Sequence, residues 1–314
     1  VSGFVILAER SMRIGDIVRV DNFEGRITDI NARYTLQACR ASGCVDAATA
    51  TVETALLTGA VGYFKGTHQA PTGVDWTGVS VALSADGSTL AVGATGDDSG
   101  ATGINGDPGN AAASGSGAVV VFVRSGGGWT QQAYIKASNT ASETSFGFSV
   151  ALSADGNTLA AGSIGERGGA TGINGDQTNS TMDDSGAVYV FSRGSAGAAW
   201  SQQAYIKASN TDTGDVFGNA LALSFDGNTL AVGAPQEASS ATGMNGNQAD
   251  NTVWQAGAAY IYRRDGSTWN QRAYVKPMST KMSLAFGRTL ALSADGHTLA
   301  VGADNQFDGA LYLY

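Results

Sequence analysis

The sequence predicts an all-β protein: a β-propeller of four four-stranded blades, closed by an N-terminal strand and preceded by a small N-terminal β segment. The first observation behind this fold class is a phrase of the form Leu-Ser-x-Asp-Gly-x-Thr-Leu-Ala, which occurs four times. Its copies begin at Leu83, Leu152, Leu223 and Leu292, so they lie 69, 71 and 69 residues apart. The second observation is that similar apolar segments flank every copy, and a fixed period of this length is typical of repeat architectures.

Each repeat predicts four short strands, most clearly in the second unit, where they cover residues 150–153, 158–163, 186–191 and 203–207. These segments read VALS, TLAAGS, GAVYVF and QAYIK, with the alternation and the β-branched or aromatic content of strands. An Asp-Gly pair separates the first two strands, and we expect a two-residue type I′ hairpin there. Between the second and third strands lie polar segments, here named the long loops, which cover residues 96–116, 165–185 and 236–256.

The ring of blades is expected to close through residues 62–66. The fourth unit shows no fourth strand before Tyr314, whereas GYFK from Gly62 aligns with AYIK from Ala204 in the second unit. An unpaired sheet edge promotes association with other chains, so we expect this segment to supply the missing strand. A longer array of repeats, of which four are present here, is the alternative.

Composition excludes several classes of function. The chain has 18 Lys and Arg against 27 Asp and Glu, and its net charge of -9 argues against nucleic acid as a partner. It contains no run of 18 apolar residues, so we expect no membrane span in this sequence. The two histidines, His68 and His297, give no plausible catalytic triad, and we therefore expect no enzyme.

Residues 217–235, FGNALALSFDGNTLAVGAP, resemble the FG-GAP repeat of integrin α-chain propellers and of related bacterial surface proteins. The resemblance extends over residues 62–314 through close variants in the other units. It implies a non-catalytic extracellular or cell-surface module for binding or adhesion, which recognises a protein or carbohydrate ligand through its loops.

Calcium is the cofactor to consider for such a module. In the family the turn between the first two strands often carries a calcium loop, but here it is reduced to an Asp-Gly turn, in which Asp is explained by its tolerance of positive φ. Oxygen-rich sequence lies in the long loops instead. The alternative is that these side chains form Asx turns with their own backbone. The candidate Ca²⁺ ligands are Asp97, Asp98, Asp107, Asp176, Asp183 and Asp184.

Aromatic and amide side chains in the long loops are the candidates for ligand contact. Trp254 breaks the period, because its counterparts in the other long loops are polar. Asn105, Asn174 and Asn245 recur in these loops. The periodic Trp129, Trp200 and Trp269 are expected to pack between blades, and the periodic Lys136, Lys207 and Lys276 to lie along an outer edge strand.

Residues 1–35 have no counterpart in the repeats and resemble part of the small-conductance mechanosensitive channels. The matching elements are the apolar residues 3–7, the Ile-Gly-Asp-Ile-Val segment at 14–18 and the Glu-Gly-Arg-Ile segment at 24–27. They correspond to the end of the pore helix and the start of the middle β-domain. The resemblance implies, as an alternative function, an accessory or fused part of such a channel, with membrane association. Residues 36–61 are expected to be a linker, in which Cys39 and Cys44 form either a small disulfide loop or two free thiols.

Overall fold

The computed structural model describes residues 77–125, 128–304 and 309–314, and four short strands nearer the N-terminus. The chain divides into two compact units, Val1–Tyr63 and Phe64–Tyr314. In the first unit β1 (Ile17–Val20) pairs with β2 (Phe23–Arg26), and β3 (Gln37–Arg40) pairs with β4 (Gly43–Asp46). The β3–β4 hairpin lies within the segment expected to be a linker, and its register places Cys39 opposite Cys44.

The described part of the second unit contains four antiparallel sheets, one for each repeat, and each sheet keeps its strands in chain order. Among the described residues there is no helix, and hence no helix that could span a membrane. The first sheet contains β5 (Thr77–Leu83), β6 (Thr89–Ala94), β7 (Ala118–Ser125) and β8 (Gly128–Ile135). The second contains β9 (Phe146–Leu152), β10 (Thr158–Ser163), β11 (Ala187–Ser192) and β12 (Ser201–Ile206). The third contains β13 (Ala220–Leu223), β14 (Thr229–Ala234), β15 (Ala258–Asp265) and β16 (Thr268–Val275). The fourth has three strands, β17 (Phe286–Leu292), β18 (Leu299–Ala303) and β19 (Ala310–Leu313).

The Asp-Gly turns differ from the two-residue type I′ hairpin that we expected. In the turn of the first sheet, at residues 85–88, only Gly87 has a positive φ, 66°, and its N–H donates to the carbonyl of Ser84 (2.9 Å). Asp86 instead accepts the Ser84 hydroxyl (2.6 Å) and the Ser88 N–H (2.9 Å), which closes a wider loop. These hydrogen bonds lower the pKa of Asp86 to about 2. Asp recurs in the phrase because its carboxylate fixes the turn, not because it tolerates positive φ.

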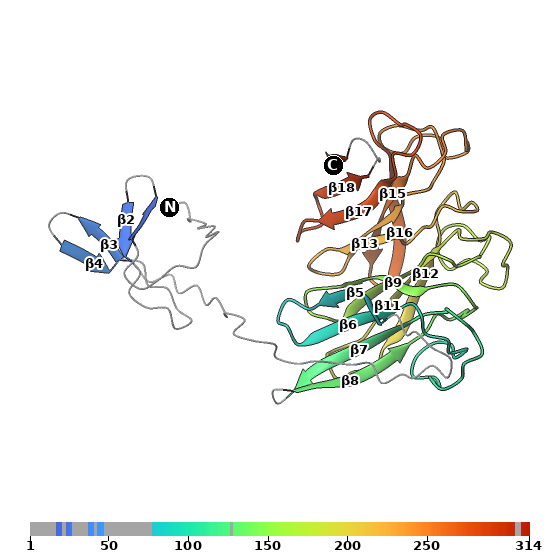
Figure 1. Cartoon of the computed structure of the whole chain (residues 1–314), viewed down its shortest axis with the longest axis horizontal. Helices are drawn as coiled ribbons and strands as arrows, with labels where there is room; N and C mark the ends of the chain where they lie inside the picture. Colours follow the sequence, from blue (N-terminus) through green and yellow to red (C-terminus); the bar gives the residue numbers. More distant parts are fainter. Residues whose placement is uncertain are drawn as a thin grey trace. The chain divides into compact units, whose positions relative to one another are not determined.

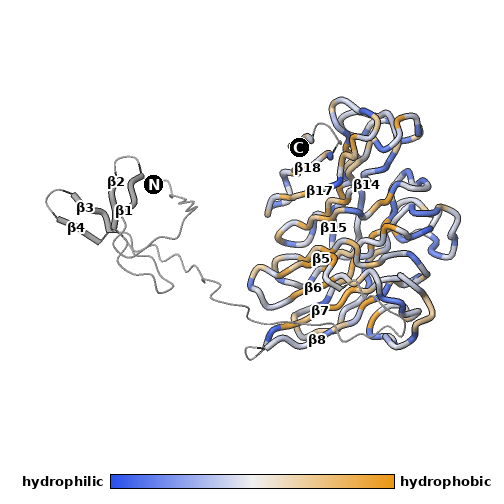
Figure 2. Tube along the Cα trace, viewed as in Figure 1, coloured by the Kyte–Doolittle hydropathy of each residue, from blue (hydrophilic) through white to orange (hydrophobic). Residues whose placement is uncertain are grey.

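The sheets stack face to face, and the core lies between them (Figure 1). Figure 2 shows the hydrophobic segments following the strands, with hydrophilic residues at the turns and loops. Between the first two sheets, the Phe146 ring lies 5.3 Å from that of Tyr189 in a T-shaped arrangement. Trp200 packs there as predicted, since it is 5% exposed and its Nε1 donates to Gln132 Oε1 of the first sheet (2.9 Å).

The predicted ring closure is not found. The stack is an open, propeller-like array in which the first and fourth sheets lie at opposite ends (Figure 1). The reason is geometric: each sheet packs on the next through one repeated contact, and the three steps between four sheets do not bring the last sheet back to the first. The proposed closing strand, residues 62–66, lies outside the described residues.

Candidate functional site

Three lysines at the ends of the fourth strands form buried ion pairs, which corrects the prediction that they lie on an exposed edge. Lys136, Lys207 and Lys276 are 0% exposed. Their Nζ atoms lie 2.8, 2.7 and 2.6 Å from carboxylate oxygens of the long loops. The lysines are buried because each lies beneath its own long loop: the Lys136 N–H, for example, donates to the carbonyl of Gly103 in the first loop (2.7 Å). The acidic partners are Asp97, Glu166 and Glu237, respectively.

Each ion pair is the centre of a polar cluster, best described for Glu166. Lys207 Nζ also donates to Ser185 Oγ (2.7 Å), and the Tyr205 hydroxyl donates to Glu166 Oε1 (2.9 Å). Asn139, from the connection before the second sheet, donates to the same carboxylate (2.9 Å) and accepts the hydroxyl of Tyr189. The third cluster repeats the tyrosine and asparagine contacts, with Tyr274, Asn210 and Tyr260 around the Lys276–Glu237 pair. It differs at the serine, because Ala256 replaces Ser185 and Ser239 hydrogen-bonds Glu237 and Tyr274 instead. We name these three groups the lysine clusters.

The electrostatics of the lysine clusters follow from burial. Desolvation lowers the pKa of Lys207 and raises that of Tyr205, while the charge of Glu166 raises the pKa of both. Asp215 is buried beside the third cluster, and its pKa is raised to about 8, first by desolvation and then by the charge of Glu237. The cluster lysines donate to acceptors of the protein itself, and solvent does not reach their side chains. They are therefore suited to a structural role.

Sequence reasoning missed the lysine clusters, although the sequence contains a signal for them. A carboxylate precedes each lysine by 39, 41 and 39 residues, and a tyrosine stands two residues before each lysine. Of the three carboxylates only Asp97 is predicted to have a role, as a metal ligand, and the lysines are predicted to lie on an outer edge strand; Glu166 and Glu237 are not singled out. Pairing the two periodic sets would have predicted the contact.

The candidate ligand-binding asparagines hold the long loops to the fourth strands. Asn105 has a φ of 55°, and its Oδ1 accepts the N–H of Tyr134 (3.0 Å), while its own N–H donates to the Tyr134 carbonyl (2.7 Å). Asn174 and Asn245 repeat this geometry at Tyr205 and Tyr274. Trp254 is different, because its side chain is 59% exposed on the third long loop. A ligand role for these four residues stays a prediction.

The candidate calcium ligands are engaged locally. Asp97 belongs to the first lysine cluster, and Asp98 accepts the N–H of Gly115 (2.8 Å). Asp107 and Asp176 each accept the N–H two residues ahead, at 2.9 and 2.8 Å, which is the Asx-turn alternative. In the part of the chain that the structure describes, no three acidic, His or Cys side chains come together as a metal group. The remaining two are Asp183, 3.5 Å from Arg167 Nε, and Asp184, with a φ of 52°.

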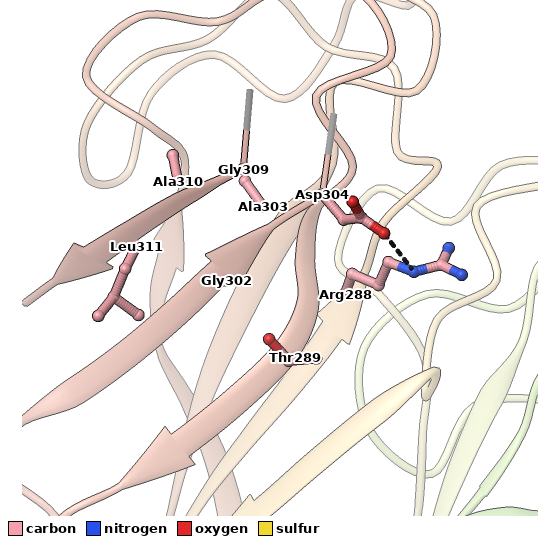
Figure 3. A pocket seen from close by; sticks show the side chains of 8 residues that line it. All are labelled: Arg288, Thr289, Gly302, Ala303, Asp304, Gly309, Ala310 and Leu311. Atoms are coloured by element: carbon pink, nitrogen blue, oxygen red, sulfur yellow. Dashed lines mark ion pairs between the residues drawn. The ribbon is translucent and has the colours of Figure 1, made fainter. Parts of the chain in front are cut away.

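A pocket of about 490 Å³ lies on the outer face of the fourth sheet, across β17, β18 and β19 (Figure 3). Arg288 and Asp304 form an exposed ion pair at its edge, with Nε and Oδ2 3.5 Å apart. The other lining residues are small or apolar, namely Thr289, Gly302, Ala303, Gly309, Ala310 and Leu311. No residue of this pocket was singled out from the sequence.

Comparison with sequence families gives two matches in separate parts of the chain. The model of the FG-GAP repeat matches residues 129–191 and 200–262, which cover parts of the first three sheets. The repeats are similar to the FG-GAP repeat. The model of the mechanosensitive ion channel β-domain matches residues 1–41, a slightly longer segment than the predicted 1–35. Both resemblances seen in the sequence are thereby confirmed. No curated protein matches this sequence.

Several solved structures are distantly similar. One is a protein from Bacteroides uniformis that is provisionally assigned as a 6-phosphogluconolactonase. The match covers 95% of this chain and 68% of that protein's chain, at 11% identity and a TM-score of 0.40. The match to the periplasmic gluconolactonase PpgL from Pseudomonas aeruginosa covers 92% of this chain and 80% of that protein's chain, at 13% identity and a TM-score of 0.33. The match to a protein from Agrobacterium tumefaciens that is provisionally assigned as TolB covers 76% of this chain and 58% of that protein's chain, at 11% identity and a TM-score of 0.37.

These findings correct the predicted function. We expected a non-catalytic adhesion module, whereas the similar structures include proteins named as lactonases. The three asparagines predicted to bind a ligand hold the long loops to the fourth strands. At such low identity and TM-scores, the likeness transfers no enzymatic activity to this chain either.

Proposed function

We propose that residues 77–314 act as a structural scaffold, a stiff stack of sheets that fixes the positions of its long loops. The observation that supports this is the threefold recurrence of a buried lysine paired with a carboxylate that also accepts a tyrosine hydroxyl. The donors and acceptors of each cluster hydrogen-bond one another, so these groups stabilise the fold. A catalytic lysine or carboxylate would need access to a substrate, and these have none.

The second cluster shows how the scaffold is tied together. Glu166 belongs to the second long loop, Lys207 follows β12, and Asn139 precedes β9 on the side of the first sheet. One carboxylate therefore connects a loop, a strand end and the connection from the neighbouring sheet. Removing one partner of a buried pair leaves the other charge uncompensated, which is strongly destabilising.

The test is Lys207→Met in the full chain, with Arg263→Met, a variant of an exposed cation on β15, as the control. We expect Lys207→Met to lower the free energy of unfolding by about 3 kcal/mol and to expose the second long loop to limited proteolysis. A double variant, Lys207→Met with Glu166→Leu, should recover part of the loss. Unchanged stability and unchanged loop cleavage in Lys207→Met would contradict the scaffold role.

We also propose that the chain is membrane-associated through its N-terminal unit. The support is the match of residues 1–41 to the β-domain of a mechanosensitive ion channel. Fractionation of cells that express the full chain tests this, with a chain lacking residues 1–63 as the control. Recovery of both chains in the soluble fraction alone would contradict it.

A further inference from the structure

Neighbouring sheets are joined by the same pair of glycines. The pairs are Gly93 with Gly147, Gly162 with Gly218, and Gly233 with Gly287. In each pair a methyl group on the first glycine would collide with the carbonyl oxygen of the second. The second glycines have φ values of 86°, 91° and 90°, a conformation that favours glycine. Close backbone approach at these pairs therefore defines the interface between sheets.

The two ends of the array carry the unpaired halves of this interface. By its position in the repeat, Gly302 on the fourth sheet is the counterpart of Gly93, and no atom of a further sheet lies against it among the described residues. Gly78 on the first sheet is the counterpart of Gly147. Its φ is 85°, as at the internal interfaces, yet no described atom lies within 4 Å of its Cβ position.

Apolar side chains at both ends are exposed where their counterparts are covered. Leu311, which pairs with Gly302 in register, is 71% exposed. The matching Val119, which pairs with Gly93, is 0% exposed beneath the second sheet. Leu313 is likewise 69% exposed. At the other end Val81 and Leu83 are 65% and 57% exposed, whereas their counterparts on β9, β13 and β17 are partly buried against the preceding sheet.

The pocket in Figure 3 is the unfilled counterpart of the place where a next sheet begins. It contains Gly309, whose counterparts Gly117, Gly186 and Gly257 form bridges to Phe146, Phe217 and Phe286 of the following sheet. It also contains Thr289. The hydroxyls at the matching positions, Ser80 and Ser149, donate to the carbonyls of Gly147 (2.7 Å) and Gly218 (2.6 Å) of the following sheet.

We propose that a second copy of this chain occupies this end, so that the first sheet of one copy packs on the fourth sheet of the other, head to tail. The contact would then join two sets of residues. The first-sheet end of one copy contributes Gly78, Val81 and Leu83, and the fourth-sheet end of the other copy contributes Gly302, Leu311 and Leu313. A chain cannot pair its own ends in this structure, since they lie at opposite ends of the stack (Figure 1).

Closure of this assembly follows from symmetry. Head-to-tail contacts form either a ring or an open filament, depending on the rotation between copies. Two copies supply about eight sheets, which is within the usual range of four to eight blades for a closed propeller. We therefore assign the assembly as a closed dimer with two identical interfaces.

The test is sedimentation velocity of the full chain over a wide range of concentrations, with two end variants. Leu311→Asp blocks only the fourth-sheet end, and Val81→Asp blocks only the first-sheet end. Both side chains are exposed in the single chain, so circular dichroism should show both variants to be folded. Each variant alone should associate at least about 100-fold more weakly, because its interface would bury an unpaired charge. Phe225→Asp, an exposed hydrophobe at a turn of the third sheet, is the control and should associate like the unmodified chain.

Mixing the two variants distinguishes this interface from any other. Leu311→Asp keeps an intact first sheet and Val81→Asp keeps an intact fourth sheet, so the mixture should form a dimer through the one good interface. A monomeric unmodified chain would overturn the proposal. So would association that persists in both end variants, which would place the contact elsewhere, for example in the N-terminal unit. Failure of the mixture to associate would also overturn it, because it would indicate a symmetric contact.

Discussion

The second and fourth sheets are built from the same repeat but reach different degrees of burial. On the second sheet, Val188 and Val190 are 0% exposed because the third sheet covers them. On the fourth sheet, the matching Leu311 and Leu313 are about 70% exposed. Local sequence therefore determines the strands of each unit, whereas burial depends on the neighbour. Units of a repeat protein share their core in this way and are stabilised through their interfaces.

The largest effect should come from removing an aromatic anchor between covered sheets. Phe217 is 0% exposed, and its ring lies 5.2 Å from that of Tyr260. Phe217→Ala should lower the free energy of unfolding by about 3–5 kcal/mol, because it leaves a cavity between the second and third sheets. Urea denaturation followed by fluorescence measures this.

The matched control for this variant is Phe225→Ala, at a side chain that is 62% exposed. It should change the free energy of unfolding by less than about 0.5 kcal/mol. Equal losses in the two variants would show that the interface between sheets is not the principal source of stability.

A glycine substitution compares an internal interface directly with the open end. Gly162→Ala places a methyl group against the backbone of Gly218 and should cost about 1–3 kcal/mol through overpacking. Gly302→Ala, at the matching position of the fourth sheet, meets only the Thr289 side chain, which can move. Thermal unfolding at low protein concentration should show a smaller loss for Gly302→Ala. A larger loss there would contradict the view that this end is open in the single chain.

Asp215 makes the stability of the middle of the array depend on pH. Its pKa is raised from 3.8 to about 8, so the protonated form is favoured in the folded protein. The stability from this shift is fully present below pH 3.8 and is lost as the pH rises towards 8. Asp215→Asn imitates the protonated form and should raise the melting temperature by about 5 °C at pH 8.

The gain in Asp215→Asn should shrink as the pH falls to 5, since the unmodified carboxyl is then largely protonated. Asp176→Asn is the control, because this exposed carboxyl has a lowered pKa and accepts the N–H of Thr178. Melting temperatures of both variants against pH measure the effect. A gain that does not vary with pH would contradict a buried, protonated Asp215.

The sequence predicts the strands of this fold better than it predicts their assembly. The Asp-Gly phrase and its apolar flanks locate β10 at its observed bounds and β9 only in its second half, because strand alternation and turn residues are local signals that are strongest beside the turn. Ring closure depends on the rotation between sheets, to which no local signal corresponds. The lysine clusters were missed for a related reason. Glu166 and Lys207 are 41 residues apart, and only the fold shows that a polar loop covers the lysine.

The smallest expected effect concerns a hydrogen bond that differs between otherwise equivalent interfaces. Ser149 Oγ donates to the carbonyl of Gly218 across the second interface (2.6 Å), whereas the matching position at the third interface is Ala220. The third interface forms without this bond, so Ser149→Ala should cost only about 1 kcal/mol. Ala220→Ser should gain a similar amount if its hydroxyl reaches the carbonyl of Gly287. Urea denaturation of each variant and of the double variant measures the change in the free energy of unfolding. A change near zero in the double variant would show that the two interfaces contribute independently and through the same hydrogen bond.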